Sequence, residues 1–219
     1  MSLVTLLSTY LWPCLSVVIG QADIDAFVHS AKNDMLTPEG VMSAVVTKGI
    51  PVNGQHSTWC RTALHWAVFR QRREVVVALL AVGADANIKN KYGETSVKWG
   101  ASFGTANILQ LLIDGGGCVN EPDIYGRTPL IEVVRWHGRE AAARLQVLLA
   151  CPESDLDAKH DGLTAEECAM ACVRPEVAFV IAQERARRER WNALRERWSA
   201  LRAAWIGATI ASTVAFSII

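Results

Sequence analysis

The side chains that could carry out chemistry are few, and their spacing assembles no complete catalytic or metal site. The chain of 219 residues contains five histidines and six cysteines. Cys60 and His65 are spaced so that both could bind one zinc ion, but no second pair of ligands lies nearby, and a structural zinc site needs four. Cys168 and Cys172 share a helix face, where two small buried residues are the simpler interpretation.

Motifs of the common enzyme classes are also missing from the sequence. There is no phosphate-binding glycine loop, no nucleophile elbow and no H-E-x-x-H. Gly115-Gly116-Gly117 follows a helical pattern rather than a strand, so it predicts a helix stop. Lys+Arg and Asp+Glu both count 22, so the net charge does not point to nucleic acid. We therefore predict a protein that is not an enzyme and uses no cofactor, metal, nucleic acid or small-molecule substrate. A metal or thiol enzyme is the least favoured alternative.

The cysteines do not show the spacing of a disulfide framework. They are Cys14, Cys60, Cys118, Cys151, Cys168 and Cys172. A chain of this length can bury a sizeable core without cross-links. We expect reduced, buried thiols and hence a reducing compartment, either the cytosol or the interior of an organelle.

The elements that position these residues follow a repeat of 33 residues. Thr62, Thr95 and Thr128 are 33 apart, within Arg61-Thr62-Ala63-Leu64-His65, Gly93-Glu94-Thr95-Ser96-Val97 and Gly126-Arg127-Thr128-Pro129-Leu130. Downstream, Leu79-Leu80…Gly83-Ala84-Asp85-Ala86-Asn87 returns as Leu112-Ile113…Gly116-Gly117-Cys118-Val119-Asn120. A fourth unit, Gly162-Leu163-Thr164-Ala165, is displaced by three residues, which places an insertion near Arg139–Arg144.

This repeat resembles the ankyrin repeat, G-x-T-P-L-H-x-A…L-L-x-x-G-A-D-x-N, over about residues 23–183. The resemblance implies an all-α solenoid of four to five helix-turn-helix units, each burying its apolar face against its neighbours. Threonine would cap the first helix of a unit, and Gly83 and Gly116 would end the second in a left-handed conformation. His65 would bond the backbone of the next unit. Six leucines would be buried between units: Leu79, Leu80, Leu111, Leu112, Leu148 and Leu149.

Some units depart from the family pattern. The third has Pro152 in place of its C-terminal glycine, and the second has Ser96 for proline and Lys98 for histidine. The first unit lacks the Thr-Pro turn, and its helices are predicted at about Asp23–Asp34 and Pro38–Lys48. We interpret these departures as a capping unit and sequence drift within the same fold.

The resemblance also implies a binding surface for a protein partner at the variable positions of the family. The loop tips are Trp59, Tyr92 and Tyr125; the groove positions are Phe69, Arg70, Ser102, Phe103, Arg135 and Trp136; the residues before each threonine are Arg61, Glu94 and Arg127. Aromatic residues and arginine are enriched at interface hot spots. The alternative is that several of these side chains pack on neighbouring helices or on the C-terminal extension.

A long helix is predicted after the repeats, because no glycine or proline occurs between Pro175 and Gly207. Its heptad seam consists of Trp191, Leu194, Trp198, Leu201 and Trp205. Residues 184–202 contain seven arginines and three glutamates, so the seam is flanked by charge. It should pack either on a partner helix or back on the repeats.

Both ends of the chain are uncharged. Residues 203–219, about 25 Å of helix, resemble a tail anchor, with Ile206, Ile210, Val214 and Phe216 facing the membrane. The alternative is an apolar helix packed in protein. Residues 1–22 could be a signal peptide cleaved after Gly20-Gln21-Ala22, although the segment lacks a basic start, or a membrane-inserted or buried helix bent at Pro13.

The sequence therefore predicts four segments: a hydrophobic N-terminal segment (1–22), an ankyrin-repeat domain (23–183), an amphipathic Arg/Trp-rich helix (184–202) and a transmembrane or buried C-terminal helix (203–219). The function favoured by this organisation is a membrane-attached interaction module or scaffold that binds a protein partner. The alternative is an accessory subunit of a large membrane protein assembly, with both apolar ends packed among other subunits.

Overall fold

The computed structural model describes residues 19–136 and 140–216, with side chains up to residue 202. The signal-like or membrane-inserted segment expected at the N-terminus therefore lies largely outside the described residues. The same holds for the side chains of Trp205, Ile206, Ile210, Val214 and Phe216, which were expected to face the seam or the membrane.

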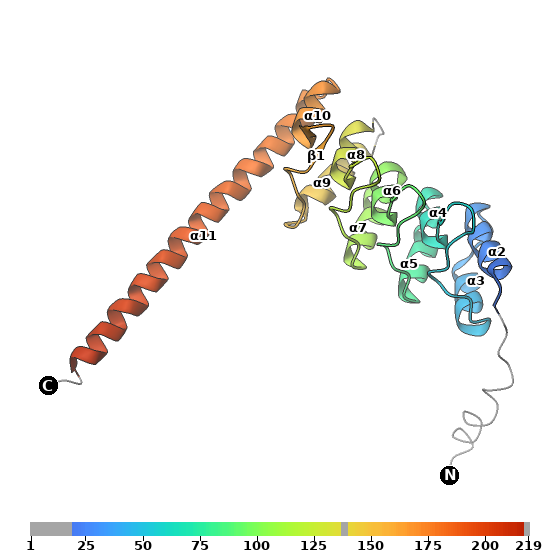
Figure 1. Ribbon diagram of the computed structural model, residues 1–219, viewed down its shortest axis with the longest axis horizontal. Coiled ribbons are helices and arrows are strands. Elements are labelled where there is room, and N and C mark those ends of the chain that lie inside the picture. The colour runs from blue at the N-terminus through green and yellow to red at the C-terminus, as the bar shows by residue number, and fades with distance from the viewer. Residues whose placement is uncertain (1–18, 137–139, 217–219) are drawn as a thin grey trace, which may run out of the picture.

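Paired helices form a stack of helix-turn-helix units that ends in one long projecting helix (Figure 1). This arrangement confirms the predicted all-α repeat solenoid and the two helices expected for its first unit. The elements are α2 (Gln21–Lys32), α3 (Pro38–Met42) continued by the short π-helix η2 (Ser43–Thr47), α4 (Ala63–Phe69), α5 (Arg73–Ala81), α6 (Ser96–Phe103), α7 (Ala106–Asp114), α8 (Pro129–Arg135), α9 (Ala141–Ala150), α10 (Ala165–Ala171) and α11 (Pro175–Phe216). A short antiparallel hairpin, β1 (Lys159–His160) with β2 (Leu163–Thr164), precedes α10.

The ends of the helices follow the local signals of the repeat. Thr62, Thr95, Thr128 and Thr164 stand at the N-caps of α4, α6, α8 and α10. A threonine hydroxyl at this position satisfies an otherwise unpaired N–H of the first turn. The glycines after α5 and α7 adopt the predicted left-handed backbone, with φ of +88° and +87°.

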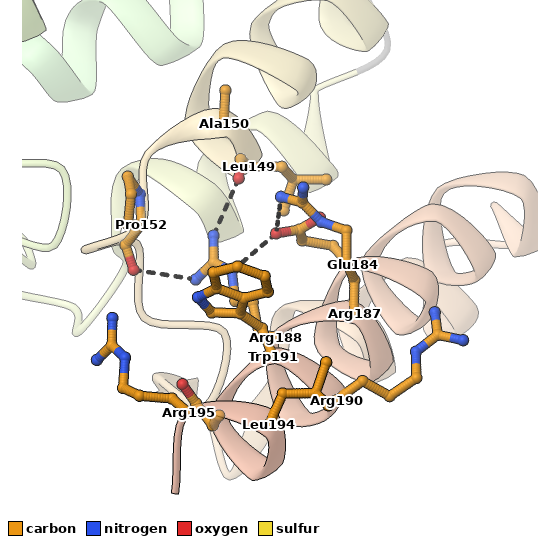
Figure 2. Close-up of a pocket in the computed structure, with 11 residues that line it drawn as sticks. Leu149, Ala150, Pro152, Glu184, Arg187, Arg188, Arg190, Trp191, Leu194 and Arg195 are labelled. Carbon is orange, nitrogen blue, oxygen red and sulfur yellow. Dashed lines mark hydrogen bonds and ion pairs between the residues drawn. The ribbon is translucent and has the colours of Figure 1, made fainter. Parts of the chain in front are cut away.

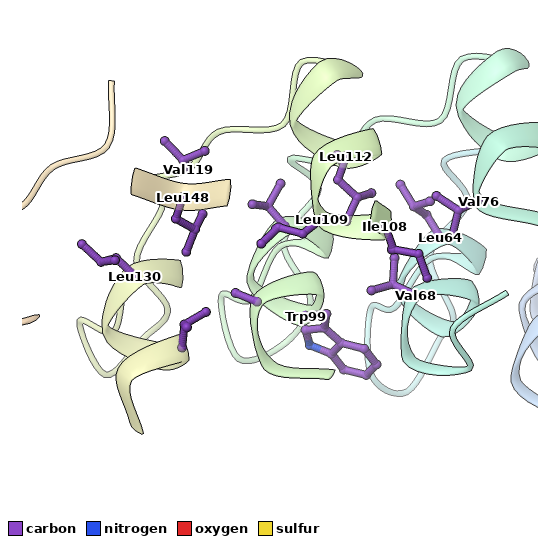
Figure 3. Close-up of a cluster of buried hydrophobic side chains, with 14 of the residues drawn as sticks. Leu64, Val68, Val76, Trp99, Ile108, Leu109, Leu112, Val119, Leu130 and Leu148 are labelled. Carbon is purple, nitrogen blue, oxygen red and sulfur yellow. The ribbon is translucent and has the colours of Figure 1, made fainter. Parts of the chain in front are cut away.

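The hydrophobic core runs through the stack between successive units (Figure 3). Leu79, Leu112 and Leu148 are fully buried, as predicted. Leu80 and Leu111 are only half-buried, which corrects the expectation that both members of each leucine pair face the core. Neighbouring helix residues point about 100° apart, so one member of a pair lies at the edge of the apolar face. Leu149 is buried at 6% exposure, where the base of α11 meets the end of α9.

The last helix belongs to the stack only at its base. Val177, Ala178 and Ile181 are buried, and α11 then leaves the repeats, so that every side chain from residue 189 to 202 is exposed (Figure 1). From Trp191 to Leu201, where its side chains are described, the predicted seam therefore does not fold back on the repeats, which corrects that alternative.

In the part of the chain that the structure describes, no helix is long and apolar enough to cross a membrane. This finding does not support the transmembrane helix predicted at 203–219.

Candidate protein-binding surface

Five aromatic side chains form a continuous row across the first helices of three successive units. The members of this aromatic row are Trp66, Phe69, Trp99, Phe103 and Trp136. Ring centroids of Phe69 and Phe103 are 5.2 Å apart at 73°, and those of Phe103 and Trp136 are 5.2 Å apart at 69°. Such edge-to-face pairs contribute about 0.5–1.5 kcal/mol each beyond their buried area. The rings therefore hold one another in place across the repeat boundaries.

Three of these five residues were among the predicted groove positions, and the structure brings these three together. Phe69 and Trp136 remain 39% and 43% exposed, while Phe103 is half-buried between them. Trp66 and Trp99 were missed, although their separation of 33 residues was a usable signal. Trp99 is 5% exposed and forms the floor of the row. Both interpretations of these positions, packing on neighbouring helices and exposure to a partner, therefore apply to the row, because its rings pack on neighbouring repeats and still present faces to solvent.

The remaining groove positions differ in accessibility. Arg70 is exposed, and its Nε donates to the Lys32 carbonyl at 2.9 Å, which ties the end of α4 to the first unit. Arg135 is exposed at the end of α8. Ser102 is buried at 7% exposure, and its hydroxyl donates to the Lys98 carbonyl at 3.1 Å. Ser102 is therefore not available to a partner, since it lies on the side of α6 that faces the stack.

The predicted loop tips form two separate aromatic–cation groups. Trp59 stacks on Tyr92 with centroids 6.0 Å apart and an angle of 26°, and Lys91 Nζ lies 5.6 Å from the Trp59 ring. Tyr125 is 57% exposed, and the guanidinium of Arg127 lies 5.0 Å from its ring. Each tip offers a flat ring beside a positive charge.

Arg61 connects the tips to the aromatic row. Its guanidinium carbon lies 4.9 Å from the Trp66 ring, 4.8 Å from the Trp99 ring and 5.5 Å from the Trp59 ring. A guanidinium over an aromatic face is held by cation–π attraction. Arg61 therefore fixes three indoles that come from different parts of two units.

A buried charge cluster lies beside the aromatic row. Its one trace in the sequence is Lys98, which stands at a position where the repeat has histidine. Lys98 is 1% exposed. Its Nζ lies 2.8 Å from Asp123 Oδ2, 3.1 Å from Glu94 Oε1 and 3.7 Å from Glu132 Oε2. Arg127 Nη2 adds a second ion pair to Asp123 at 2.7 Å. One lysine thus links one carboxylate of its own unit, Glu94, to two carboxylates of the next.

The charge cluster orients two members of the aromatic row. Trp99 Nε1 donates to Glu94 Oε2 at 2.9 Å, and Trp136 Nε1 donates to Glu132 Oε1 at 2.8 Å. Burial would raise the pKa of Glu94, but hydrogen bonds from Asn90 and Trp99 and the charge of Lys98 outweigh it and hold that pKa below its ordinary value. The carboxylate is therefore ionised at neutral pH and accepts the indole N–H strongly.

The pKa of Asp123 is lowered in a similar way. Burial opposes ionisation, and the hydrogen bond from Lys98, with those from the Arg127 backbone and side chain, overcomes it. Asp123 Oδ1 also accepts from the backbone N–H groups of Tyr125 and Arg127 at 2.9 Å each, so the same residue shapes the loop tip. The cluster therefore couples the position of this tip to the aromatic row.

His65 fills the site that Lys98 occupies one unit later, and the predicted bond between units is confirmed. Its Nε2–H donates to the Glu94 carbonyl at 3.1 Å, and its Nδ1 accepts from the Thr62 hydroxyl at 2.9 Å. The ring is completely buried, and this burial lowers its pKa from 6.5 to about 4. At neutral pH the histidine is uncharged and structural.

The five cysteines that the structure describes are not arranged to bind a metal ion. Within the described residues, no group of three or more His, Cys, Asp or Glu side chains could hold a metal ion. Cys60, Cys118, Cys151, Cys168 and Cys172 are free thiols, and only Cys168 is buried. The expectation of uniformly buried thiols is therefore wrong, because the other four lie at loop tips and helix ends rather than in the core. The reducing compartment inferred from them stays a prediction.

Comparison with known proteins agrees with the repeat geometry. Residues 64–160 match the family model for ankyrin repeats, in three copies. Among curated proteins, the chain is 39% identical over 93 residues to the Neurogenic locus Notch protein of Drosophila melanogaster (42% of this chain, 3% of that protein). It is 28% identical over 124 residues to Rabankyrin-5 of Homo sapiens (50% and 10%). It is 34% identical over 110 residues to the Probable 26S proteasome regulatory subunit p28 of Saccharomyces cerevisiae (50% and 47%). The chain spans less than half the length of each of these relatives. Residues 64–160, which lie inside the helical stack, therefore carry three copies of the ankyrin repeat.

Proposed function

We propose that the protein is a non-enzymatic interaction module that binds a partner protein through the face formed by α4, α6, α8 and the loop tips. Ankyrin repeats are typically protein–protein interaction modules. The observation that carries the proposal is the aromatic row, whose rings are exposed at both ends and span three units. Large aromatic surfaces of this kind supply most of the binding energy at protein interfaces.

The row is organised before any partner binds. Its rings are held edge to face, and the indoles of Trp99 and Trp136 are also hydrogen-bonded to carboxylates. Side chains that are already ordered lose little conformational entropy on binding, so more of the contact energy appears as affinity. The buried Lys98 cluster supports this organisation without taking part in the contact.

The experiment is a comparison of variants against a partner isolated with the full chain as bait. We expect Phe103→Ala with Trp136→Ala to weaken binding by about 2 kcal/mol or more, close to 30-fold, while helical content measured by circular dichroism is unchanged. Phe179→Ala is the matched control, since Phe179 is 62% exposed but lies at the base of α11. Unchanged affinity of the double variant would remove this face from the proposal.

A structural subunit of a larger protein assembly is the second candidate. The observation that favours it is α11, which exposes all side chains from residue 189 to 202 and extends far from the stack (Figure 1). Recovery of the protein at fixed stoichiometry with the same set of proteins would support this role. Recovery as a free monomer would support the interaction module.

A further inference from the structure

An uncovered apolar stripe runs along α11. Trp191, Leu194, Trp198 and Leu201 alternate at steps of three and four residues, the spacing of positions a and d in a coiled coil. Their exposed fractions are 65%, 48%, 70% and 55%. We call these four residues the α11 seam. Large apolar side chains in a regular row on a solvent-exposed helix indicate a surface that packs against another helix.

Arginines border the seam on both sides. With tryptophan at position a and leucine at position d, Arg190 and Arg197 fall at position g, and Arg195 falls at position e. All three are exposed, and within the described residues none of them forms an ion pair with a carboxylate. The glutamates of this part of the helix, Glu189 and Glu196, lie at position f on the opposite face.

This charge pattern argues against pairing with a second copy of the chain. In a parallel pair, position g of one helix faces position e of the other; in an antiparallel pair, g faces g and e faces e. Every one of these pairings would place arginine against arginine. Like charges at these positions select against a partner, so the complementary helix is one with glutamate or aspartate there.

The width of the stripe argues against a lipid surface. A helix that lies in a membrane interface needs an apolar face of about 100° or more. Between residues 189 and 202 the large apolar residues are confined to positions a and d, and arginine takes the adjoining e and g positions. A strict a/d stripe is the narrower geometry of a helix–helix contact.

A groove continues the seam to the repeat stack. A cavity of about 790 Å³ lies between the end of α9 and α11, and Leu149, Pro152, Trp191 and Leu194 are among its lining residues (Figure 2). Arg190 and Arg195 also line it and give the groove a positive border like that of the seam, whereas Arg187 in the same wall is paired with Glu184. The end of a partner helix could therefore be held where α11 leaves the repeats.

The groove is bordered by one half-buried arginine, Arg188, that joins α11 to the end of α9. The guanidinium of Arg188 donates to the carbonyls of Leu149 and Cys151 at 2.9 Å each and of Ser154 at 2.6 Å, and its Nε donates to Glu184 Oε1 at 2.9 Å. These bonds cap the last carbonyls of α9 and fix the direction of α11 (Figure 2). The docking surface therefore exists without a partner.

We propose that the α11 seam and its groove bind an acidic amphipathic helix of a partner protein. Apolar side chains of that helix pack on Trp191, Leu194 and Trp198, and its carboxylates pair with the bordering arginines. This surface is separate from the aromatic row, so an experiment can refute binding at one surface without refuting binding at the other.

The test uses the full chain and a fluorescent synthetic peptide of four heptads, with leucine at a and d and glutamate at e and g. We expect saturable binding by fluorescence anisotropy, weakened at least about tenfold by Trp198→Ala. Phe179→Ala, and Phe103→Ala with Trp136→Ala, should bind the peptide as the unchanged protein does. All these side chains are wholly or partly exposed, and circular dichroism verifies that each variant is folded.

A charge exchange makes the test specific. A second peptide carries lysine instead of glutamate at e and g, and the unchanged protein should bind it at least about tenfold more weakly. Arg195→Glu with Arg197→Glu should reverse that preference. Equal binding of the two peptides, or no saturable binding of the acidic peptide, would overturn the proposal. So would a dimer in sedimentation that Trp198→Ala abolishes, or Trp198-dependent sedimentation with phosphatidylserine vesicles, since these outcomes assign the seam to a second copy or to lipid.

Discussion

Replacement of Lys98 with methionine tests whether the buried charge cluster stabilises the stack. Lys98 is 1% exposed, and the side chains of its partners Asp123 and Glu132 are 0% and 7% exposed. Methionine has nearly the same length, so the cavity left by Lys98→Met is small. The main effect is the loss of the charge that, among the described residues, contacts all three carboxylates of the cluster.

The expected loss in free energy of unfolding follows from the carboxylate charges that remain when Lys98 is removed. Without the lysine, Arg127 is, in the part of the chain that the structure describes, the one cation within ion-pair distance of Asp123 and Glu132, and its side chain is 24% exposed. Removal of one partner from a buried ion pair typically costs about 3–5 kcal/mol, because the other charge stays buried and uncompensated. We expect a loss in this range at pH 7, a large part of the usual 5–15 kcal/mol of a folded domain.

The assay is urea unfolding of the unchanged protein, Lys98→Met, Asp123→Asn and the double variant. Asparagine retains an oxygen that can accept from the loop backbone, as Asn90 Oδ1 does in the preceding loop by accepting from Tyr92 and Glu94 N–H. The double variant should recover at least half of the lysine loss, since one of the uncompensated charges is gone. Such a recovery measures the interaction between the two side chains directly.

The pH dependence has a defined sign. The lowered pKa values of Glu94 and Asp123 contribute stability that is present above the ordinary carboxyl pKa of about 4 and is lost as pH falls through the folded-state values. Without Lys98 these pKa values rise, so the carboxylates of Lys98→Met are protonated at a higher pH than those of the unchanged protein. Their protonation removes the uncompensated buried charge from the variant. The stability difference between the unchanged protein and Lys98→Met should therefore shrink between pH 7 and pH 4. A difference below about 1 kcal/mol, or one independent of pH, would refute the reasoning.

Two further predictions concern single buried side chains. Leu112→Ala should lower the free energy of unfolding by about 2–5 kcal/mol in urea, whereas the half-buried Leu111 should lose less than half as much on the same change; equal losses would contradict the packing described for α7. The folded-state pKa of His65, about 4 against 6.5, contributes about 3 kcal/mol that is present above pH 6.5 and lost as pH falls toward 4. His65→Gln should therefore flatten the decline in stability between pH 7 and pH 5, and parallel curves for the two proteins would exclude this role.

The sequence alone was sufficient for the repeat and its helix ends, because these depend on local chemistry. A threonine at an N-cap or a glycine in a left-handed turn acts within one or two turns of helix. The period of 33 residues then places each unit beside the next.

The orientation of the leucine pairs could not be predicted from local signals. Which of Leu79 and Leu80 faces the core depends on the rotation of α5 against its neighbours, and only the packed stack decides it.

The candidate surface was predicted in part. The resemblance pointed to Phe69, Phe103 and Trp136, but the contacts among these rings cross unit boundaries and appear only when the units are stacked. The Lys98 cluster could not be predicted from the sequence for the same reason. Its carboxylates come from position 94 of one unit and positions 123 and 132 of the next, and no local pattern connects them.

The apolar stripe of α11 was evident from the sequence, since a heptad period is a local property of one helix. The direction of α11 relative to the repeats was not evident from the sequence. The period is equally compatible with a helix folded back on the repeats and with one that projects from them. The packing of Val177 and Ile181 at the base and the bonds from Arg188 to the end of α9 set that angle. Tertiary contacts at the first turns of α11 therefore decide that the seam faces solvent, where it can meet a partner.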